Sequence, residues 1–428
     1  TTASNNTAVG YRALDLNTTG ANRTAIGFES SKGSDTETDG TVSVGYRAMY
    51  MNSATTADAT DSVAVGYLAL SATAATTASL INNTGVGAYA LSFNASTTAT
   101  ANYNAAVGTS AMQFNANTTG TVQYNAALGY EALEVNSNTT GTVTNNTAIG
   151  YQALKSSSNT SGTIQYNTAV GSNALDVCVA SNNTAVGALA LDANTTGGSN
   201  TALGQASMTT LTTASYNTAA GLNSGLLLTT GASNTLIGVS AGTTLTTGTL
   251  NVAVGRNALG GGATTNRNVA IGNDTLQSVS AASDVDSYNV AIGYSSGGSV
   301  TTGTGNVGVG GLALSGASTG NNNTAVGFQA SRYMTTASSI TAIGYLAGGG
   351  TGGATVMTGN DNVLVGALSG KSITSGTRNV AVGNSAMENG TLTGADNTAV
   401  GHNSLNSLTS ANYNTAVGAY TLDANTTG

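Results

Sequence analysis

The chain of 428 residues has no proline or tryptophan, one cysteine, one histidine and only 7% charged residues. Cys178 alone cannot form an internal disulfide, and His402 alone cannot build a histidine metal cluster or a Ser-His-Asp triad within one chain. The formal net charge is −8 and the ten Lys and Arg form no run, so we expect no nucleic-acid partner. No stretch of about eighteen apolar residues occurs, which excludes membrane insertion as a helix.

One sequence motif is repeated many times along the chain. "NNTAVGYRALDLNTTG" at residues 5 to 20 returns as "NNTAVGALALDANTTG" at residues 182 to 197. Alignment on the glycine of "TAVG" gives 23 units, with eleven intervals of 17 residues and seven of 21. Repeat glycines from across the chain are Gly10, Gly27, Gly108, Gly187, Gly255 and Gly418. Repetition of this kind predicts a solenoid, here a single continuous domain over residues 1–428.

The two interval lengths locate a corner in each unit. "TTG" occupies residues 18 to 20 in the 17-residue unit after Gly10, and residues 118 to 120 in the 21-residue unit after Gly108. The longer unit therefore gains two residues before "TTG" and two after it. Side chains alternate between faces along a strand, so a two-residue extension keeps inside and outside unchanged. The pattern predicts an all-β parallel solenoid, or β-roll, in which two strand-like arms meet at "TTG".

Alternation also predicts which rows face the interior of a coil. It places inside the Val, Ile or Leu directly before the repeat glycine and the Leu or Met four residues after it. The same rule places inside the tyrosines five residues before the glycine, namely Tyr103, Tyr124, Tyr166, Tyr288 and Tyr413. The Ala two residues before the glycine then points to a second buried face, between neighbouring chains. These alanines include Ala8, Ala148, Ala169, Ala185 and Ala202.

An asparagine lies four residues before the repeat glycine in 19 of the 23 units. Examples are Asn6, Asn146, Asn183 and Asn268. One amide at a fixed place in every coil predicts a ladder of side chains that hydrogen-bond along the solenoid axis. The alternative interpretation is that asparagine only marks a turn at this place.

The repeated "NTAVGYxAL...NTTG" unit, as in "NTAIGYQAL" at residues 146 to 154, resembles the head repeats of trimeric autotransporter adhesins and similar repeats of phage tail fibres. The resemblance covers essentially the whole chain. It implies a left-handed β-roll, a parallel homotrimer and an extracellular place on a cell surface or a virion fibre. The units here are longer than the adhesin type, and no receptor-binding residue carries over.

Only one segment suggests a cation ligand. In "GSDTETDG", residues 33 to 40, Asp35, Glu37 and Asp39 precede a glycine, as at the start of a calcium loop. The twelfth position of that loop is Tyr46 rather than a bidentate glutamate. A solvated acidic loop is therefore the alternative, and we expect no other cofactor.

Fifteen Asn-x-Ser/Thr sequons offer possible glycosylation sites. We expect those at the "NTT" corner to be exposed, because corners of a solenoid face solvent. They are Asn17, Asn117, Asn138, Asn194 and Asn425.

Three function classes follow from these features. The first is the structural shaft of an extracellular fibre, of which this chain is a segment, with copies of itself as partner. The alternative is an adhesive head that binds a cell-surface receptor or glycan, for which residues 30 to 50 are the one irregular segment. A polysaccharide-active enzyme is a remote alternative, because it needs clustered carboxylates that the sequence does not supply. We expect the chain not to be an enzyme.

Overall fold

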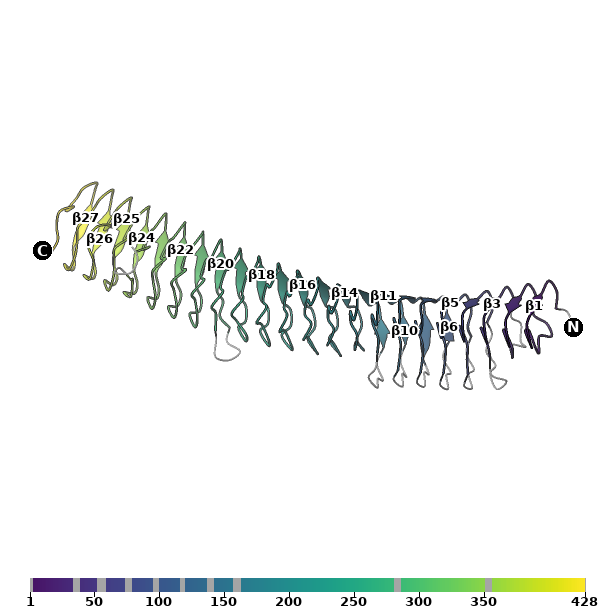
Figure 1. Cartoon of the computed structure of the whole chain (residues 1–428). Coiled ribbons are helices and arrows are strands. Elements are labelled where there is room, and N and C mark those ends of the chain that lie inside the picture. Colours follow the sequence, from purple (N-terminus) through teal and green to yellow (C-terminus); the bar gives the residue numbers. More distant parts are fainter. Residues whose placement is uncertain are drawn as a thin grey trace. The chain divides into compact units, whose positions relative to one another are not determined.

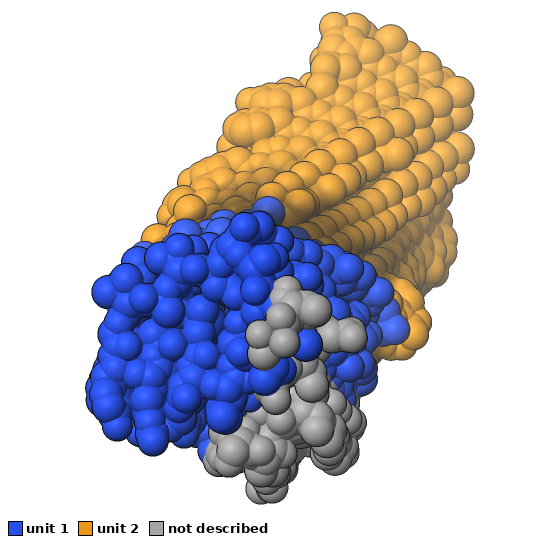
Figure 2. Space-filling model, turned by 90° about the vertical axis from the view of Figure 1, so that its right-hand side faces the viewer, with its two compact units in different colours: residues 1–216 blue, residues 217–428 orange. Residues whose placement is uncertain are grey.

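A computed structural model describes most of the chain. The described ranges are residues 3–33, 39–51, 59–73, 79–94, 100–115, 120–136, 142–156, 163–280, 286–350 and 356–427. Within these ranges the chain is all β, with no helix. It divides into two compact units, Thr1–Tyr216 and Asn217–Gly428, which Figure 2 colours separately. Each unit is a parallel β-solenoid, which confirms the predicted fold class.

Unit 1 contains a parallel sheet of three-residue strands, stacked one coil upon the next (Figure 1). Each strand ends at the residue before a repeat glycine. Residues at the same position of successive repeats pair with one another, as Ala8 does with Ala25. The strands are β1 (Thr7–Val9), β2 (Thr24–Ile26), β3 (Val42–Val44), β4 (Val63–Val65), β5 (Thr84–Val86), β7 (Ala105–Val107), β9 (Ala126–Leu128), β11 (Thr147–Ile149), β13 (Thr168–Val170), β14 (Thr184–Val186) and β15 (Thr201–Leu203).

Unit 2 repeats the arrangement, again with every strand parallel to the next and in register. Its strands are β16 (Thr218–Ala220), β17 (Thr235–Ile237), β18 (Val252–Val254), β19 (Val269–Ile271), β20 (Val290–Ile292), β21 (Val307–Val309), β22 (Thr324–Val326), β23 (Thr341–Ile343), β24 (Val363–Val365), β25 (Val380–Val382), β26 (Thr398–Val400) and β27 (Thr415–Val417).

The 21-residue coils of unit 1 carry additional ladders on both arms. Before the repeat strand lie β6 (Thr100–Asn102), β8 (Thr121–Gln123), β10 (Val143–Thr144) and β12 (Ile164–Gln165), which form a four-stranded parallel sheet. On the other arm, parallel bridges join Met51, Ala72, Phe93, Phe114, Val135 and Ser156 in turn. On the arm before the repeat strand the added residues, such as Thr121 and Val122, are paired as strands, as the two-residue extension predicted. On the other arm the chain is bridged as far as the position of Phe114, and residues 116–119 lie outside the described ranges.

The predicted assignment of faces is wrong for the repeat strand. Ala185 is fully buried, whereas Val186 beside it is 38% exposed. The alanine row lies inside the coil, as Ala148, Ala169, Ala185 and Ala202 show, and only Ala8 in the first coil is exposed. The tyrosine row lies outside, with exposed fractions of 50% for Tyr103, 56% for Tyr124, 60% for Tyr166, 53% for Tyr288 and 81% for Tyr413.

Left-handed backbone explains the inversion. Asn182, Leu189 and Leu191 have φ values of 64°, 59° and 52°, and residues at the same places in other coils are similar. Alternation holds only along extended backbone, so it cannot be carried across these residues from one arm to the next. The interior is consequently built from the alanine two residues before the repeat glycine and from the alanine and leucine three and four residues after it.

Some coils carry glycine where others carry that leucine, as at Gly242. The backbone is the same, since φ is 58° at Gly242 and 54° at Leu259. A Cβ at Gly242 would lie 2.7 Å from the side chain of Leu236, which stands where most coils have alanine. The glycine therefore compensates in volume for the larger neighbour.

The repeat glycines form a stack of their own. Gly187 has a φ of 136°, a region that favours glycine strongly. A Cβ there would lie 2.5 Å from the carbonyl oxygen of Gly204 in the next coil. Both the backbone angle and the close approach of successive coils require glycine at this place.

Candidate functional site

The asparagine ladder is present and buried. The side-chain amide of Asn183 donates to the carbonyl of Gly197 at 3.0 Å, across the coil to the "TTG" corner. Its side-chain oxygen accepts the backbone N–H of Asn200 in the next coil, also at 3.0 Å. Asn268 likewise bonds to Asn251 through both its backbone and its side-chain nitrogen. The predicted ladder is thus confirmed, and asparagines such as Asn183 also bond across their own coil.

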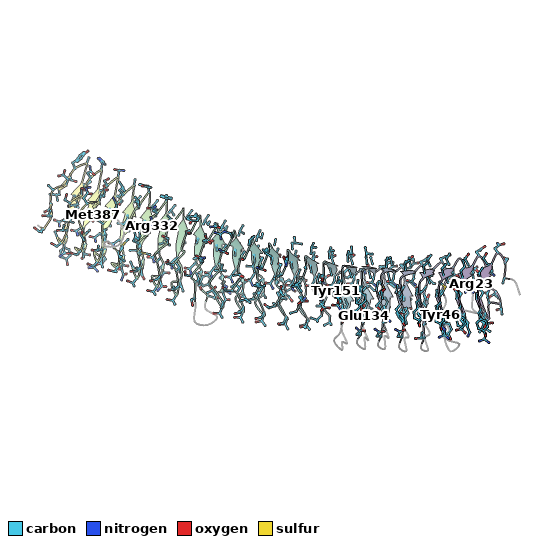
Figure 3. The ribbon with its side chains drawn as sticks, viewed as in Figure 1. Arg23, Tyr46, Glu134, Tyr151, Arg332 and Met387 are labelled. Atoms are coloured by element: carbon cyan, nitrogen blue, oxygen red, sulfur yellow. The ribbon has the colours of Figure 1, made fainter. Side chains whose placement is uncertain are left out.

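Near the start of unit 1 the ladder is interrupted. Asn6 donates to the carbonyl of Gly20 at 2.8 Å, but Arg23, Thr41 and Ser62 occupy the next three ladder positions. Arg23, labelled in Figure 3, is fully buried and donates to the Thr41 hydroxyl at 3.2 Å. Burial lowers the pKa of Arg23 to about 10, against the opposing effect of a nearby carboxylate. The sequence analysis did not identify this residue, although it is a charged exception to the asparagine row.

The corner asparagines Asn17 and Asn194 turn their side chains towards the corner backbone rather than into solvent. Asn194 is fully buried, and it both accepts the N–H of Gly197 at 3.1 Å and donates to its carbonyl at 2.9 Å. Asn17 makes the same pair of bonds to Gly20. Other coils place Cys178 and Leu211 at this position, both buried, so the row belongs to the interior. The expected exposure is therefore wrong for Asn194.

The remaining corner sequons fall in different situations. Asn425 is half-buried, and Asn117 and Asn138 lie outside the described residues. Six other sequons have their asparagine exposed, in the left-handed region, just before the ladder position. They are Asn5, Asn22, Asn82, Asn145, Asn182 and Asn322.

The other candidate groups of the sequence are placed as follows. Asp35 and Glu37 of the calcium candidate lie outside the described residues, and Asp39 accepts the N–H of Ala21 at 2.6 Å. Among the described residues no three His, Cys, Asp or Glu side chains are grouped as metal ligands. His402 is exposed beside Tyr420, with the two ring centroids 5.1 Å apart, and Cys178 is a buried free thiol.

A ladder of stacked aromatic rings runs along the outside of the first four coils of unit 1, one residue after the repeat glycine in each. The ring centroids of Tyr11 and Phe28 are 5.1 Å apart, those of Phe28 and Tyr46 5.2 Å, and those of Tyr46 and Tyr67 5.1 Å. The four residues are between 40% and 61% exposed. Because the inner rings have both faces covered by neighbours, the ladder presents ring edges to solvent. Tyr46 is labelled in Figure 3.

A row of charged residues adjoins this aromatic ladder. Arg12, Glu29 and Arg47 each lie two residues after a repeat glycine, in three successive coils. Glu29 is buried, and its carboxylate accepts hydrogen bonds from Arg47 Nε at 2.7 Å and from Lys32 Nζ at 2.6 Å. Arg12 lies further away, with its Nη1 atom 4.0 Å from Oε1 of the same carboxylate. One carboxylate is thus shared by three cations.

The electrostatics of this row follow from that sharing. The hydrogen bond from Lys32, together with Arg47 and against the effect of burial, holds the pKa of Glu29 below its usual range. The guanidinium of Arg47 lies 5.3 Å from the ring centroid of Tyr46 and 4.9 Å from that of Tyr50. The guanidinium of Arg12 lies 5.6 Å from the centroid of Tyr11. The side chains of Arg12 and Arg47 remain 51% and 38% exposed.

A second charged cluster lies further along unit 1. Lys155 contacts both Glu131 and Glu134, at 3.3 Å in the case of Glu134. Burial alone would raise the pKa of Glu131, but hydrogen bonds from Lys155 and Gln152 lower it to about 2. Burial raises the pKa of Glu134. A single lysine bridges the two carboxylates, but Glu134 Oε2 is buried without a hydrogen-bond partner and meets Lys155 only as an ion pair.

An aliphatic row forms the outward face of the main sheet in each unit. It consists of the Val, Ile or Leu that ends each repeat strand, for example Ile149, Val186 and Leu203, which are 39%, 38% and 42% exposed. In unit 1 all eleven strands of this sheet end in such a residue. A continuous apolar line of this kind marks an interaction surface more often than a free surface.

A comparison with models of known protein families gave no match, and a comparison with curated proteins gave none either. In the part of the chain that the structure describes, no helix has the length and apolar character needed to cross a membrane.

Proposed function

We propose that this chain is a structural shaft segment of an extracellular fibre, either a surface fibril or adhesin or a phage tail fibre. The observation that carries the proposal is the repetition of one bonding scheme from coil to coil within each unit. Strands, buried amides and glycines all bond or pack against their own copies in the next coil. In such a protein most side chains serve the stacking of each repeat on its neighbours, which suits an extended structural element.

The proposal includes a parallel homotrimer of left-handed β-rolls. The contact face differs from the alanine rows first expected, because those alanines fill the coil interior. The outward aliphatic row, with Ile149 and Val186 as members, takes their place. In unit 1 it is a line of eleven aliphatic residues, one at the end of every strand of the main sheet, and contiguous exposed apolar patches mark interaction sites. Three copies around a common axis would cover their rows together and leave no apolar edge to propagate sideways.

The oligomeric state tests this proposal directly. Light scattering on the purified chain should give close to three times the chain mass of 41.6 kDa. A soluble particle with the mass of one chain would refute the trimer. An image of the native particle, in which the segment is found away from any fibre, would refute the shaft.

The alternative function is an adhesive head, with a receptor or glycan as partner. The aromatic ladder with its row of Arg12, Glu29 and Arg47 favours this alternative, because it combines four neighbouring exposed rings with a row of charged side chains. A polysaccharide-active enzyme remains the remote alternative, and Glu131 with Glu134 is the carboxylate pair it would use. Glycans on the exposed sequons would be compatible with the shaft and with the head, since both are extracellular.

A further inference from the structure

We propose that the aromatic ladder of Tyr11, Phe28, Tyr46 and Tyr67, with the flanking Arg12 and Arg47, binds an acidic polysaccharide laid along the solenoid axis. The inference does not depend on the trimer or on the shaft function. It adds a ligand site, and a ligand class, to one region of unit 1.

The first argument is charge. The chain as a whole carries a net charge of −8, yet Arg12, Lys32 and Arg47 gather around Glu29, and among the described residues Asp15 is the only other carboxylate paired with them. The described part of this cluster therefore has three cations and two carboxylates. In unit 2, by contrast, Arg256, Lys371 and Arg378 are each paired with a carboxylate of the neighbouring coil.

The second argument is the hydrogen-bonding capacity that remains. Arg47 uses Nε on Glu29, which leaves the guanidinium end group directed away from that bond. Arg12 lies 3.6 Å from Asp15 and 4.0 Å from Glu29, both longer than a hydrogen bond. Both side chains can therefore still offer paired N–H donors, the geometry that suits a carboxylate or a sulfate.

The third argument is the shape and polarity of the aromatic surface. Rings stacked about 5 Å apart show their edges, and ring edges carry the positive end of the aromatic quadrupole. Such a surface attracts oxygen acceptors rather than cations. A chain rich in hydroxyl and ether oxygens fits it, and a row of ring edges gives that chain an extended track.

The spacing of the two arginines along the solenoid axis also fits an acidic polysaccharide. Arg12 and Arg47 lie two coils apart, which places them about 10 Å apart along the axis. This is close to the length of one disaccharide in an extended β-linked glycan. A polymer with one acidic group on every second sugar would therefore present an anion to each arginine in turn while its neutral sugars lie against the rings.

The test uses the full chain and two hexasaccharides of equal length. The acidic probe alternates glucuronate with N-acetylglucosamine, and the neutral probe contains N-acetylglucosamine alone. Calorimetric titration should show binding of the acidic probe that weakens with salt, and no binding of the neutral one. The double variant Arg12→Gln, Arg47→Gln should lose about tenfold or more in affinity.

Two single variants sharpen the result. Arg256→Gln removes from unit 2 an arginine that is more exposed than Arg12 or Arg47, and it should leave the affinity unchanged. Glu29→Gln keeps the shape of the side chain but removes the shared carboxylate, and it should tighten binding severalfold. Unchanged affinity in the double variant overturns the proposal, as does an equal loss in Arg256→Gln. Binding of the neutral probe, or of a short oligodeoxythymidine, as tight as that of the acidic probe overturns it too.

Discussion

The side-chain nitrogen of Asn146 donates to the side-chain oxygen of Asn125 at 3.0 Å, although the two residues are 21 positions apart. The same nitrogen donates to the carbonyl of Ile164 at 2.8 Å. The side-chain oxygen of Asn146 accepts from both nitrogens of Asn167. A primary amide has two donors and two lone pairs, so every hydrogen-bonding position of this buried side chain is used.

Loss of that amide should therefore be costly. Asn146→Ala leaves a buried backbone N–H and a buried carbonyl without partners, and we expect it to lower the free energy of unfolding by about 3 kcal/mol. Asn146→Asp should cost more, because a carboxylate cannot donate to the two oxygens that face it. Urea titration followed by circular dichroism measures both. The neighbouring variant Asn145→Gly is the control, since Asn145 is exposed with a φ of 58°, and it should change little.

The asparagine ladder could be predicted because its cause lies in the sequence alone. Asparagine recurs at one position of most repeats while the neighbouring residues vary. This pattern indicates that each asparagine bonds to the equivalent asparagine of the next coil. The parallel coils and the lengthened arms followed in the same way from periods of 17 and 21 residues. Only the position of each repeat relative to the next was needed, not the direction of any side chain.

The face to which each side chain points could not be predicted, because it depends on backbone φ angles that the amino-acid sequence does not show directly. Leu191 is buried, as expected, but Val186 is not, and Gly187 and Leu189, both with positive φ, separate the two. The sequence contained one signal that was missed. Seven residues after the repeat glycine, Leu211, Leu228 and Leu245 form an apolar row at the position of the corner asparagines, which marks that row as interior.

The corrected faces predict opposite outcomes for two adjacent residues. Ala185→Asp places a carboxylate inside the coil and should lower the free energy of unfolding by several kcal/mol. Val186→Asp should leave the coil folded, because its side chain faces outward. Combined with Val170→Asp and Leu203→Asp, it should convert the proposed trimer to single chains in light scattering. A variant of these three positions that keeps the trimer mass would remove the aliphatic row as the contact face.

The stacked glycines give a matched pair of neighbours in unit 2. Gly310 has a φ of 133°, and a Cβ there would lie 2.4 Å from the carbonyl oxygen of Gly327. Gly311 meets only the ring of Phe328, at 3.2 Å, and other coils already carry alanine at its place, as Ala188 shows. Gly310→Ala should therefore cost about 3 kcal/mol or more.

Gly311→Ala should cost less than about 1 kcal/mol, since the ring can move by the few tenths of an ångström required. Thermal unfolding of the two variants beside the parent protein compares them under one condition. Equal melting temperatures for Gly310→Ala and Gly311→Ala would mean that the close approach of the coils is not what selects glycine.

Glycosylation should follow the exposed sequons rather than the corner. In one coil of unit 1, Asn182 is exposed with a φ of 64°, whereas Asn194 is fully buried and bonded to Gly197. If the chain is secreted from a host with N-glycosylation, folded protein should carry sugar at Asn182 and not at Asn194. Peptide mass spectrometry after enzymatic release, which converts a glycosylated asparagine to aspartate, reads each position separately. Occupancy of Asn194 in folded protein would contradict the geometry of the corner.

The buried thiol gives a pH dependence with a definite sign. Burial raises the pKa of Cys178 to about 11, because the surrounding interior disfavours the thiolate, although amide donors from Asn183 and Asn194 approach the sulfur at 3.8 and 3.7 Å. Below pH 9 the thiol is protonated in both the folded and the unfolded chain, so it contributes no pH dependence there. Between about pH 9 and 11 the unfolded chain releases the proton and the folded chain retains it, so stability falls as pH rises.

The comparison with Cys178→Ala isolates this effect from other groups that titrate in the same range. The variant is less stable than the parent protein at neutral pH, because a packed sulfur atom is lost from the corner row. This difference does not depend on pH. We expect the parent protein to lose about 2 kcal/mol more than the variant between pH 8.5 and 10.5 in urea titrations. Parallel curves for the two proteins over this range would mean that the thiol ionises as easily in the fold as outside it, and that the corner row is open to water.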